Sequence, residues 1–322
     1  GEKSMKVLVT SAAFGQPAMQ ENIKYLNSVA DTVVMKPSQK PLTAKEIATC
    51  WDGVDGIIAG MEPYTKEILA QAPENLKVIS RYGVGYDRID TEAAKEKGIS
   101  VCITPGANSK AVAELTMAMM LALSRGIVNH DKNVKEGKWI RPIGFGLEGR
   151  TLGILGFGAI GREVSLMAKV MGMTVIAYDP FFNEAFAKEN GILKGTLDEV
   201  YEKSDFITLH MPVTTDTKYM INKESIARMK DGVYLVNCAR GELVDCEAVY
   251  EALKNGKIAG FGVDAYEQEP PVITDLYKHP NVIATPHVGG HSVKAAERMG
   301  RMAIDNMLEV LEKGECRFCV NK

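Results

Sequence analysis

Three side chains in the second half of the chain have the types needed for acid–base chemistry on a small acid. His287 ends an apolar run in ATPHVGGHS, and an imidazole can give or take a proton near neutral pH because its ordinary pKa is about 6.5. Arg240 follows the apolar run VYLVNC, and a guanidinium fork suits bidentate binding of a carboxylate. Glu269 lies in VDAYEQEPP, where it could pair with the imidazole and hold its ring.

Each of these residues also has a plainer interpretation. Arg240 could be a surface arginine in a salt bridge, and Glu269 alone would be an ordinary loop glutamate. The apolar runs before them favour chemistry, because parallel sheets place functional groups at the carboxyl ends of their strands. The remaining histidines offer less, since His130 and His279 lie in polar contexts and His291 begins a helical pattern.

A glycine motif between two apolar runs predicts a dinucleotide site. Residues 151–155 have the pattern of a buried strand, and Gly156, Gly158 and Gly161 follow as G-x-G-x-x-G at the start of a helical pattern. In such a site the glycines permit a tight turn, close approach of a pyrophosphate and packing of helix on strand. The phosphates would lie at the N-terminus of the helix. An ordinary turn is the plainer alternative.

The residue after the next strand favours the dinucleotide interpretation and indicates which cofactor binds. Residues 174–178 form a second apolar run that ends at Asp179, and no arginine follows directly. A carboxylate in this place accepts hydrogen bonds from ribose hydroxyls and would repel a 2′-phosphate. The sequence therefore predicts NAD rather than NADP. Asp264, at a later strand end, could bind the nicotinamide carboxamide.

The elements that must position these residues alternate along the chain. In the first hundred residues, strand-like runs at 6–10, 32–35, 56–59, 76–80 and 100–104 alternate with helical patterns at 17–29, 43–48, 65–71 and 91–97. A long helix is expected after Pro105, with Asn108 or Ser109 near its start, and residues 129–147 are expected to form a loop. Further strands are predicted at 206–210, 233–237, 261–263 and 282–284, and a last helix at 292–313.

This alternation predicts an α/β fold with two doubly wound parallel-sheet domains. The last helix would return the chain to the first domain. That domain would therefore be discontinuous, comprising residues 1–104 and 294–322, with the nucleotide-binding domain at 105–293.

Composition excludes several classes of function. The chain has 322 residues, enough for two domains, and a formal net charge of −3 without a basic run, so we expect no nucleic-acid partner. Its most apolar helical stretch, 115–124, is far shorter than the roughly 20 residues that span a bilayer. Residues 1–4 resemble an expression remnant before a natural start at Met5, so a cytoplasmic protein is expected.

The six cysteines are scattered, which suits reduced thiols in a cytosol. Cys316 and Cys319 form a single C-x-x-C pair. A structural zinc site needs four ligands, and no second pair or nearby histidine accompanies these two. We therefore expect two incidental thiols and no metal.

Over nearly its whole length the chain resembles the D-isomer-specific 2-hydroxyacid dehydrogenases, and most of all the 3-phosphoglycerate dehydrogenases and the hydroxypyruvate and glyoxylate reductases among them. Seven motifs follow the order of that family: SRYGVGYDRID, TPGANSKAVAEL, GILGFGAIG, LHMPVTTDTKYMIN, VNCARGELVD, GVDAYEQEP and TPHVGG. The resemblance implies a flavodoxin-like substrate-binding domain and a Rossmann NAD-binding domain. It also implies an NAD-dependent oxidoreductase that transfers a hydride between the nicotinamide and C2 of a 2-oxo or D-2-hydroxy acid.

The resemblance further implies roles for individual residues. Arg240, Glu269 and His287 would be the catalytic set, with His287 as acid and base. Backbone N–H groups of Gly83, Val84 and Gly85 would bind the substrate carboxylate, with Asn108 nearby. His210 and Pro212 would close around the adenosine half of NAD, within a site lined by Gly156, Gly158, Ala159, Ile160, Gly161, Asp179, His210, Met211, Pro212, Cys238, Ala239, Asp264 and Gly290.

Two alternatives remain open at this point. A 3-phosphoglycerate dehydrogenase of serine biosynthesis could use Arg81 to bind a phosphate, and Arg141 could reach a neighbouring subunit. Against this, AGMEPYT at 59–65 departs from the arginine-bearing pattern of those enzymes. A non-catalytic NAD-sensing module, as in related corepressors, would need no acid–base pair. The family also implies a homodimer formed through the nucleotide-binding domain, with apolar residues at 112–123 in the interface.

Overall fold

A computed structural model describes residues 4–322, so the first three residues of the expected expression remnant lie outside the described residues. The chain forms two compact units. Unit 1 comprises Gly1–Asn108 and Gly290–Lys322, and unit 2 comprises Ser109–Gly289. The first unit is thus built from both ends of the chain and the second from one continuous segment.

The sheet of unit 1 has five parallel strands within residues 4–322, in the order β2-β1-β3-β4-β5. These strands are β1 (Lys6–Val9), β2 (Thr32–Met35), β3 (Gly56–Ala59), β4 (Val78–Arg81) and β5 (Ser100–Cys102). The accompanying helices are η1 (Ala12–Gly15), η2 (Pro17–Met19), α1 (Gln20–Val29), α2 (Ala44–Ala48), α3 (Lys66–Ala70), α4 (Thr91–Glu96) and α13 (Val293–Lys313).

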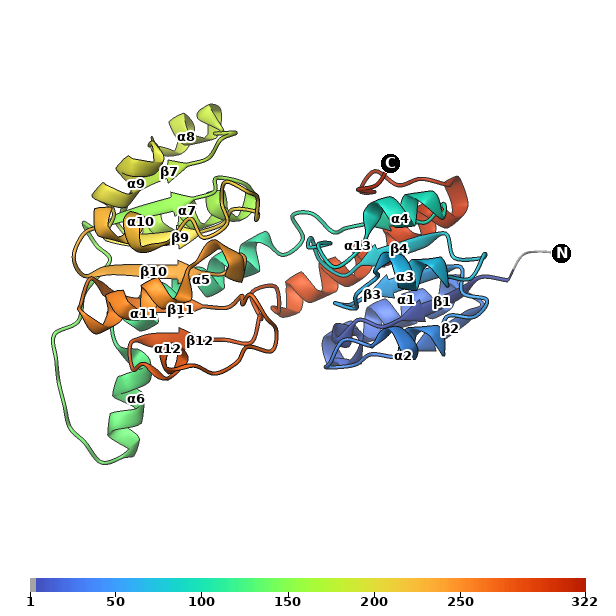
Figure 1. Cartoon of the computed structure of the whole chain (residues 1–322), viewed down its shortest axis with the longest axis horizontal. Helices are drawn as coiled ribbons and strands as arrows, with labels where there is room; N and C mark the ends of the chain where they lie inside the picture. The colour runs from blue at the N-terminus through green and yellow to red at the C-terminus, as the bar shows by residue number, and fades with distance from the viewer. Residues whose placement is uncertain (1–3) are drawn as a thin grey trace. The chain divides into compact units, whose positions relative to one another are not determined.

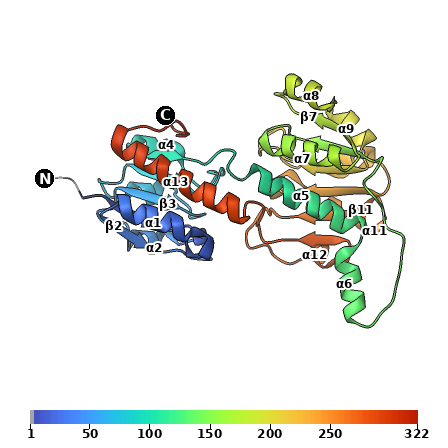
Figure 2. The ribbon, with the colours of Figure 1, turned by 180° about the vertical axis from the view of Figure 1, so that it is seen from behind.

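Helices cover both faces of this sheet (Figures 1 and 2). Successive strand side chains point to opposite faces. Accordingly Leu8 packs into the core beneath α2, α3 and α4, whereas Val7 and Val9 pack into the core beneath α1 and α13. The last helix is fixed on the sheet by a bond from the Ser80 hydroxyl to the Ala303 carbonyl, 2.7 Å long. A strand buried on both faces explains the continuous apolar runs of the sequence.

The sheet of unit 2 has seven parallel strands in the described chain, in the order β12-β11-β10-β9-β6-β7-β8. They are β6 (Thr151–Leu155), β7 (Thr174–Tyr178), β8 (Leu193–Lys194), β9 (Phe206–Leu209), β10 (Val233–Asn237), β11 (Ile258–Val263) and β12 (Val282–Ala284). The helices are α5 (Ser109–Ser124), α6 (Ile127–Lys135), α7 (Ala159–Val170), α8 (Glu184–Asn190), α9 (Leu197–Lys203), α10 (Lys223–Arg228), η3 (Gly241–Leu243), α11 (Cys246–Lys254) and α12 (Asp275–Lys278).

The two faces of this second sheet have separate cores. Helices α5 and α7 contribute Ala113, Met117 and Val164 to one core, whereas α9, α10 and α11 enclose the other. The α/β class with two doubly wound parallel sheets, predicted from the sequence, is confirmed. In unit 2, strands β7 and β8 follow β6 on one side of the sheet, and strands β9 to β12 follow on its other side. The carboxyl ends of β6 and β9 therefore lie at a topological switch point.

Helix α6 was not predicted, because residues 129–147 were expected to form a loop. The helix occupies Ile127–Lys135, and none of its residues is buried. Its apolar side chains Ile127, Val128 and Val134 are all more than half exposed. A helix is usually recognised by an apolar stripe that faces its own core, and this one has no such stripe.

No single helix within residues 4–322 is long and apolar enough to cross a membrane. Together α5 and α6 have the length and composition of a span, but they are bent by 58° at the break between them. Much of α5 is buried inside unit 2, as in the core helix of a globular unit.

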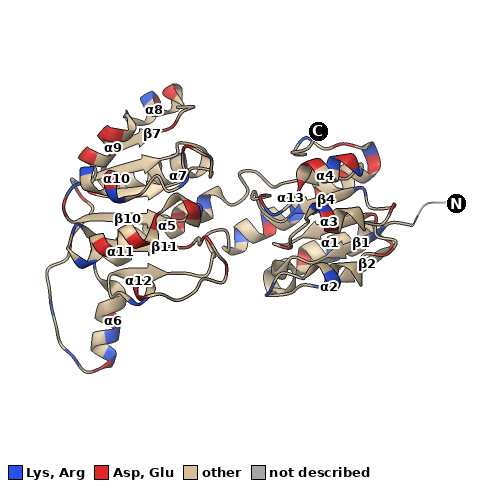
Figure 3. Cartoon of the chain, in the orientation of Figure 1, with Lys and Arg blue, Asp and Glu red and all other residues tan. Residues whose placement is uncertain are grey.

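Basic and acidic side chains are interspersed on the surface helices (Figure 3). On α9, Lys203 pairs with Glu199, and on α11, Lys254 pairs with Glu251, each about one helical turn apart. Exposed pairs of this kind contribute less than about 1 kcal/mol each. The two buried cores of each unit, and not these pairs, therefore stabilise the fold.

Candidate active site

The three predicted catalytic residues follow three strands that are neighbours in the sheet of unit 2. Arg240 comes after β10, Glu269 after β11 and His287 after β12. The register pairs β10 with β11 and β11 with β12, all in parallel. Because carboxyl ends of parallel strands meet at one edge, the loops that carry these residues emerge side by side.

His287 and Glu269 form a direct pair in which the ring Nδ1 lies 2.8 Å from Oε1 and 2.9 Å from Oε2. The Tyr266 N–H donates to the same Oε1 over 3.2 Å and fixes the carboxylate. A carboxylate accepts hydrogen bonds, so it selects the tautomer with the proton on Nδ1. With its side chain 38% exposed, the imidazole can present Nε2 for proton exchange with a substrate.

Asp264 fixes the loop that carries His287. This carboxylate, only 1% exposed, accepts bonds from the Thr285 hydroxyl at 2.6 Å and from the N–H groups of Val288 and Gly289 at 2.8 and 2.9 Å. His287 itself has a φ of 53°, a left-handed conformation that costs a non-glycine residue of order 1 kcal/mol. Asp264 offsets that strain and so positions the imidazole, while its predicted contact with nicotinamide stays a prediction.

The turn that carries Arg240 is held by Asn237, the last residue of β10. Asn237 is 1% exposed, and its amide donates to the Arg240 carbonyl over 2.8 Å and accepts from the Ala239 N–H over 3.0 Å. Asn237 and Tyr266 were not identified from the sequence. Asn237 could have been found, because an amide at the end of a buried strand needs partners.

Gly241 brings the arginine turn against the loop of Glu269. A Cβ at this position would overlap the backbone of Tyr266 and Glu267, so only glycine permits the approach. The contact joins two loops that come from different strands, and it places both functional loops in one packed cluster.

The glycine motif forms the turn from β6 into α7. Gly156 has a φ of 102°, and a Cβ there would overlap the His210 carbonyl. A Cβ at Gly161 would likewise overlap the Gly156 carbonyl. At Gly158, in contrast, nothing lies within 4 Å of such a Cβ, and no side chain caps the helix at this residue. The open space at an uncapped helix start fits a pyrophosphate.

Asp179 lies beside this turn at the end of β7. Its Oδ2 accepts from the Phe157 N–H at 2.7 Å and its Oδ1 from the Phe181 N–H at 2.8 Å. Each oxygen keeps a second lone pair for another donor. The acid is therefore fixed at the motif, where the ribose of a dinucleotide would come.

His210, at the end of β9, has two buried ring nitrogens without a hydrogen-bond partner in the described chain. Burial lowers the pKa of His210 to about 3, so its ring is neutral. Buried nitrogens are normally satisfied, and His210 directly follows β9, at the switch point where a cofactor would bind. Together with the open space at Gly158 and the carboxylate of Asp179, they fit a bound dinucleotide.

The other predicted cofactor residues of unit 2 follow the same strands or begin α7. Met211 is buried and Pro212 exposed, while Ala159 and Ile160 begin α7. Cys238 follows β10, and burial raises the pKa of its thiol to about 12. The thiol is therefore unreactive near neutral pH. Ala239 is placed by the bond to Asn237, and Gly290 belongs to unit 1.

The predicted substrate residues Gly83, Val84 and Gly85 form a turn after β4 in unit 1. The Gly83 N–H donates to the Thr104 hydroxyl over 3.0 Å, so in this conformation Val84 and Gly85 are the better candidates to bind a carboxylate. Asn108, in the same unit, packs near Gly290.

Arg81 is buried beneath this turn, with 5% of its surface exposed. Its Nε donates to the Gly85 carbonyl over 2.8 Å, and its Nη1 donates to the carbonyls of Ala59 and Gly60. These bonds indicate that Arg81 shapes the turn from inside. Contact between Arg81 and a substrate phosphate stays a prediction.

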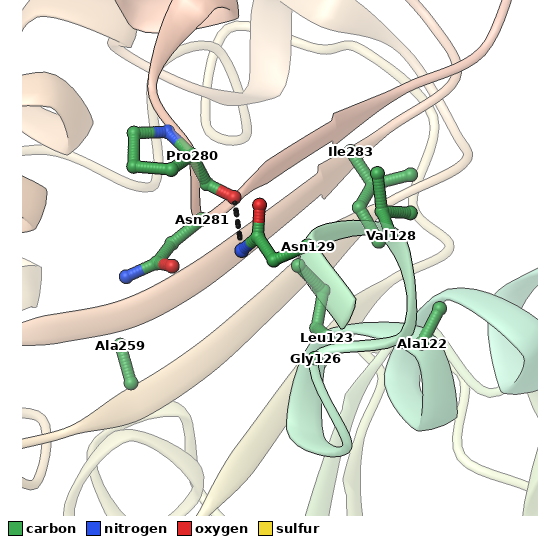
Figure 4. A pocket seen from close by; sticks show the side chains of 9 residues that line it. All are labelled: Ala122, Leu123, Gly126, Val128, Asn129, Ala259, Pro280, Asn281 and Ile283. Carbon is green, nitrogen blue, oxygen red and sulfur yellow. Dashed lines mark hydrogen bonds between the residues drawn. The ribbon is translucent and has the colours of Figure 1, made fainter. Parts of the chain in front are cut away.

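A small hollow of about 40 Å³ lies in unit 2 between α6 and the strands β11 and β12 (Figure 4). Ala259 and Asn281 line it near the amino ends of these strands, and Asn129 donates to the Pro280 carbonyl over 2.8 Å. Function in parallel sheets gathers at the carboxyl ends, so this hollow is separate from the candidate site.

Comparisons with known proteins agree with this geometry. Residues 117–289 match the family profile described as D-isomer specific 2-hydroxyacid dehydrogenase, NAD binding domain. The hydroxypyruvate reductase of Thermotoga maritima is 44% identical over 260 residues, which are 79% of this chain and 84% of that protein. The D-3-phosphoglycerate dehydrogenase of Methanocaldococcus jannaschii is 40% identical over 314 residues, 97% of this chain. The chain spans only 58% of that second relative.

Among solved structures, the D-lactate dehydrogenase of Aquifex aeolicus complexed with NAD and lactic acid matches with a TM-score of 0.81 and 31% identity. The match covers 98% of this chain and 99% of that one. The order of motifs, the strand-end geometry and these matches lead to one assignment. The chain belongs to the D-isomer specific 2-hydroxyacid dehydrogenases, a family of NAD-dependent oxidoreductases.

Proposed function

We propose that the protein interconverts a small, unphosphorylated 2-oxo acid and its D-2-hydroxy acid, with His287 as acid and base and Arg240 binding the substrate carboxylate. The observation that carries the proposal is the bond of the His287 Nδ1 to both oxygens of Glu269. A surface histidine without a role in catalysis would need no such partner. An acid–base histidine needs its ring oriented and its charged form stabilised, and the carboxylate provides both.

When NADH is bound, it supplies the hydride that reduces C2. Residues of the chain transfer the proton and orient the substrate. Nε2 of His287 gives a proton to the oxygen on C2, and Glu269 stabilises the positive ring before that transfer. Arg240 orients the acid by its carboxylate and draws electron density from the adjacent carbonyl. In the reverse direction the neutral imidazole takes the hydroxyl proton.

We also propose that the Val84 and Gly85 N–H groups bind the substrate carboxylate, as the family resemblance implies. The turn has the support for this role: Thr104 binds Gly83 on one side, and Arg81 binds the Gly85 carbonyl on the other. Fixed N–H groups bind an anion without reorganisation.

The surroundings of Arg81 favour an unphosphorylated substrate. Its guanidinium is already bonded to three carbonyls. Glu62, 2% exposed, lies close enough to interact with Arg81 and also accepts from the Thr10 hydroxyl at 2.9 Å. A phosphate is usually bound by free guanidinium groups, and here the arginine is committed to the fold and accompanied by a carboxyl group.

The test is the rate of NADH oxidation with glyoxylate, hydroxypyruvate, pyruvate, longer 2-oxo acids and 3-phosphohydroxypyruvate. We expect an unphosphorylated acid to have the highest kcat/KM. His287→Ala should lower kcat by about 10² to 10⁴ and leave the Kd for NADH unchanged. His279→Ala, a histidine outside the site in the same unit, is the matched control and should keep full activity.

Each other outcome has a definite meaning. Near-normal turnover by His287→Ala would contradict its role as the acid. A clear preference for 3-phosphohydroxypyruvate would contradict the proposed substrate class and would support binding of the substrate phosphate by Arg81. Binding of NADH without turnover on any acid would favour a sensor of the cofactor.

We further propose a cytoplasmic homodimer. The apolar residues at 112–123 that were expected in the interface are largely covered within unit 2, for example Val112 and Met119. The exposed apolar side chains lie just beyond them, on α6 and the segment after it: Ile127, Val128, Val134, Trp139, Ile140 and Ile143. A run of this size is typical of an interface. The six cysteines are thiols, which suits a cytoplasm, and cell fractionation tests this location.

A further inference from the structure

Three thiols that the proposed reaction does not use gather in unit 1. The sulfur atoms of Cys102, Cys316 and Cys319 all lie within 4.8 Å of one another. Cys102 ends β5, the edge strand of the sheet, and the other two follow α13. The C-x-x-C pair, expected to be incidental, therefore has a third partner that is 217 positions away from Cys319 in the sequence.

Cys102 and Cys319 lie directly opposite each other in a short antiparallel pairing of two chain segments. They form an antiparallel bridge in which the Ile103 N–H donates to Phe318 and the Val320 N–H donates to Val101. These bonds flank the two cysteines, so the cysteines are a non-hydrogen-bonded pair. Cα atoms of such pairs are about 4.5 Å apart with their side chains close together, which lies inside the range that a disulfide spans.

The distance between the two sulfur atoms is also compatible with a disulfide. The Sγ of Cys102 lies 3.0 Å from the Sγ of Cys319, and a disulfide bond of about 2.05 Å needs only a small rotation of the side chains from there. Cys316 also interacts with Cys102, but its Sγ has two further partners, since it donates to Asn306 Oδ1 at 3.3 Å and accepts from the Phe318 N–H at 3.4 Å.

We propose that Cys102 and Cys319 form a reversible disulfide that links residues 315–322 to the edge of the sheet. The oxidant is a small-molecule disulfide such as oxidised glutathione. Cys319, the less buried of the two, attacks it as a thiolate and releases one small thiol. Cys102 then attacks the mixed disulfide and releases the second. Two protein thiols and one small disulfide thus give one protein disulfide and two small thiols.

A zinc ion fits this cluster less well. Thiolates on one tetrahedral zinc lie about 3.8 Å apart, given a Zn–S bond of about 2.3 Å, and the closest pair here is tighter than that. Within the described residues the cluster offers three His, Cys or acidic ligands, whereas structural zinc takes four. Cys102 and Cys316 are almost fully buried, where a triply charged set of thiolates would be costly.

The link would secure contacts that already exist. Val101 donates to the Asn321 side chain over 2.8 Å, and that side chain donates to the Ile99 carbonyl over 2.8 Å. Two residues beyond Cys102, Thr104 binds the Gly83 turn. Oxidation should therefore protect residues 315–322 from proteolysis and raise the Tm, because the disulfide restrains the unfolded chain.

Trypsin makes the pairing easy to read. Its cleavage sites place Cys102 on peptide 98–110, Cys316 on peptide 314–317 and Cys319 on peptide 318–322. The full chain is incubated with oxidised glutathione and then unfolded in denaturant, free thiols are alkylated, and the tryptic digest is analysed by mass spectrometry without reduction. We expect 98–110 joined to 318–322, a product that dithiothreitol removes. Burial raises the pKa of the Cys102 thiol, so the ring closure should become faster as the pH rises.

Three variants make the result decisive. Cys319→Ser should abolish the linked peptide, whereas Cys316→Ser should keep it, and so should Cys50→Ser, a cysteine of the same unit outside the cluster. Oxidised wild type should melt about 5 °C above its reduced form, a difference that Cys319→Ser should lack. A link between 314–317 and 318–322, complete alkylation of all three thiols, or one zinc per chain that Cys319→Ser loses would each overturn the proposal.

Discussion

The imidazole of His287 depends on two carboxylates with separate tasks. Glu269 binds the ring, and Asp264 binds the Thr285 hydroxyl before it and the Val288 N–H after it. Since Asp264 has both oxygens occupied by Thr285, Val288 and Gly289, it can keep the strained φ of His287. A substitution at either acid would thus displace the same ring for different physical reasons.

His210 gives the fold a sensitivity to acid that can be measured. Burial lowers its folded pKa to about 3, while the unfolded value is about 6.5. Between these values the unfolded chain binds a proton that the folded chain does not. The free energy of unfolding should therefore fall as the pH drops below about 6.5, by up to about 1.4 kcal/mol per pH unit.

Urea unfolding of wild type and His210→Gln between pH 4.5 and pH 7 (about two units below and half a unit above the unfolded pKa) checks this. The variant should lose less stability than wild type across that window. Parallel losses in the two proteins would show that His210 is not buried in its neutral form.

At the scale of elements, the strands of unit 2 could be predicted because each apolar run is bounded by polar or glycine residues. Predicted strands 151–155, 174–178 and 233–237 coincide with β6, β7 and β10. Strand ends then located Arg240 and His287. What the sequence does not contain is the lateral order of strands, which brings Asn237 and Tyr266 to the same cluster. Their roles depend on backbone contacts between loops, which no spacing reveals.

The same limit explains Cys102. Its relation to Cys319 arises only when residues 315–322 lie along the edge of β5. Helix α6 was missed for a different reason, since its apolar residues are exposed and none of its residues is buried. Hydrophobic periodicity detects elements that bury one face. Neither helix α6 nor the Cys102–Cys319 pair is an element of that kind.

Gly241→Ala tests the contact between the Arg240 and Glu269 loops. The added Cβ would overlap the backbone of Tyr266 and Glu267, so the loops must separate. We expect a loss of about 1–3 kcal/mol in the free energy of unfolding, together with a lower kcat/KM. Gly146→Ala is the matched control because nothing lies within 4 Å of a Cβ there. Equal stability and activity of the two variants would disprove the contact.

At the scale of the whole molecule, the proposed dimer depends on the exposed apolar residues around α6. Val134→Asp or Ile143→Asp places a charge where those side chains are 57% and 102% exposed, which would be costly inside an interface. Either variant should convert the dimer to monomers in sedimentation experiments. Leu193→Asp, at a similarly exposed site on β8, should stay dimeric. A wild-type monomer, or variants that remain dimers, would exclude this surface.

The division of the chain into two units also determines the order in which they can fold during synthesis on the ribosome. Unit 2 is one continuous segment, so it can fold as soon as Gly289 has left the exit tunnel. Unit 1 cannot, because α13 covers one face of its sheet and is made only after unit 2. Until then the core around Val7, Val9 and Ile58 lacks the α13 side chains Ala303, Ile304 and Met307. The nascent chain must therefore carry one uncovered face of the unit 1 sheet while residues 109–292 are made, and this face is a natural target for a chaperone.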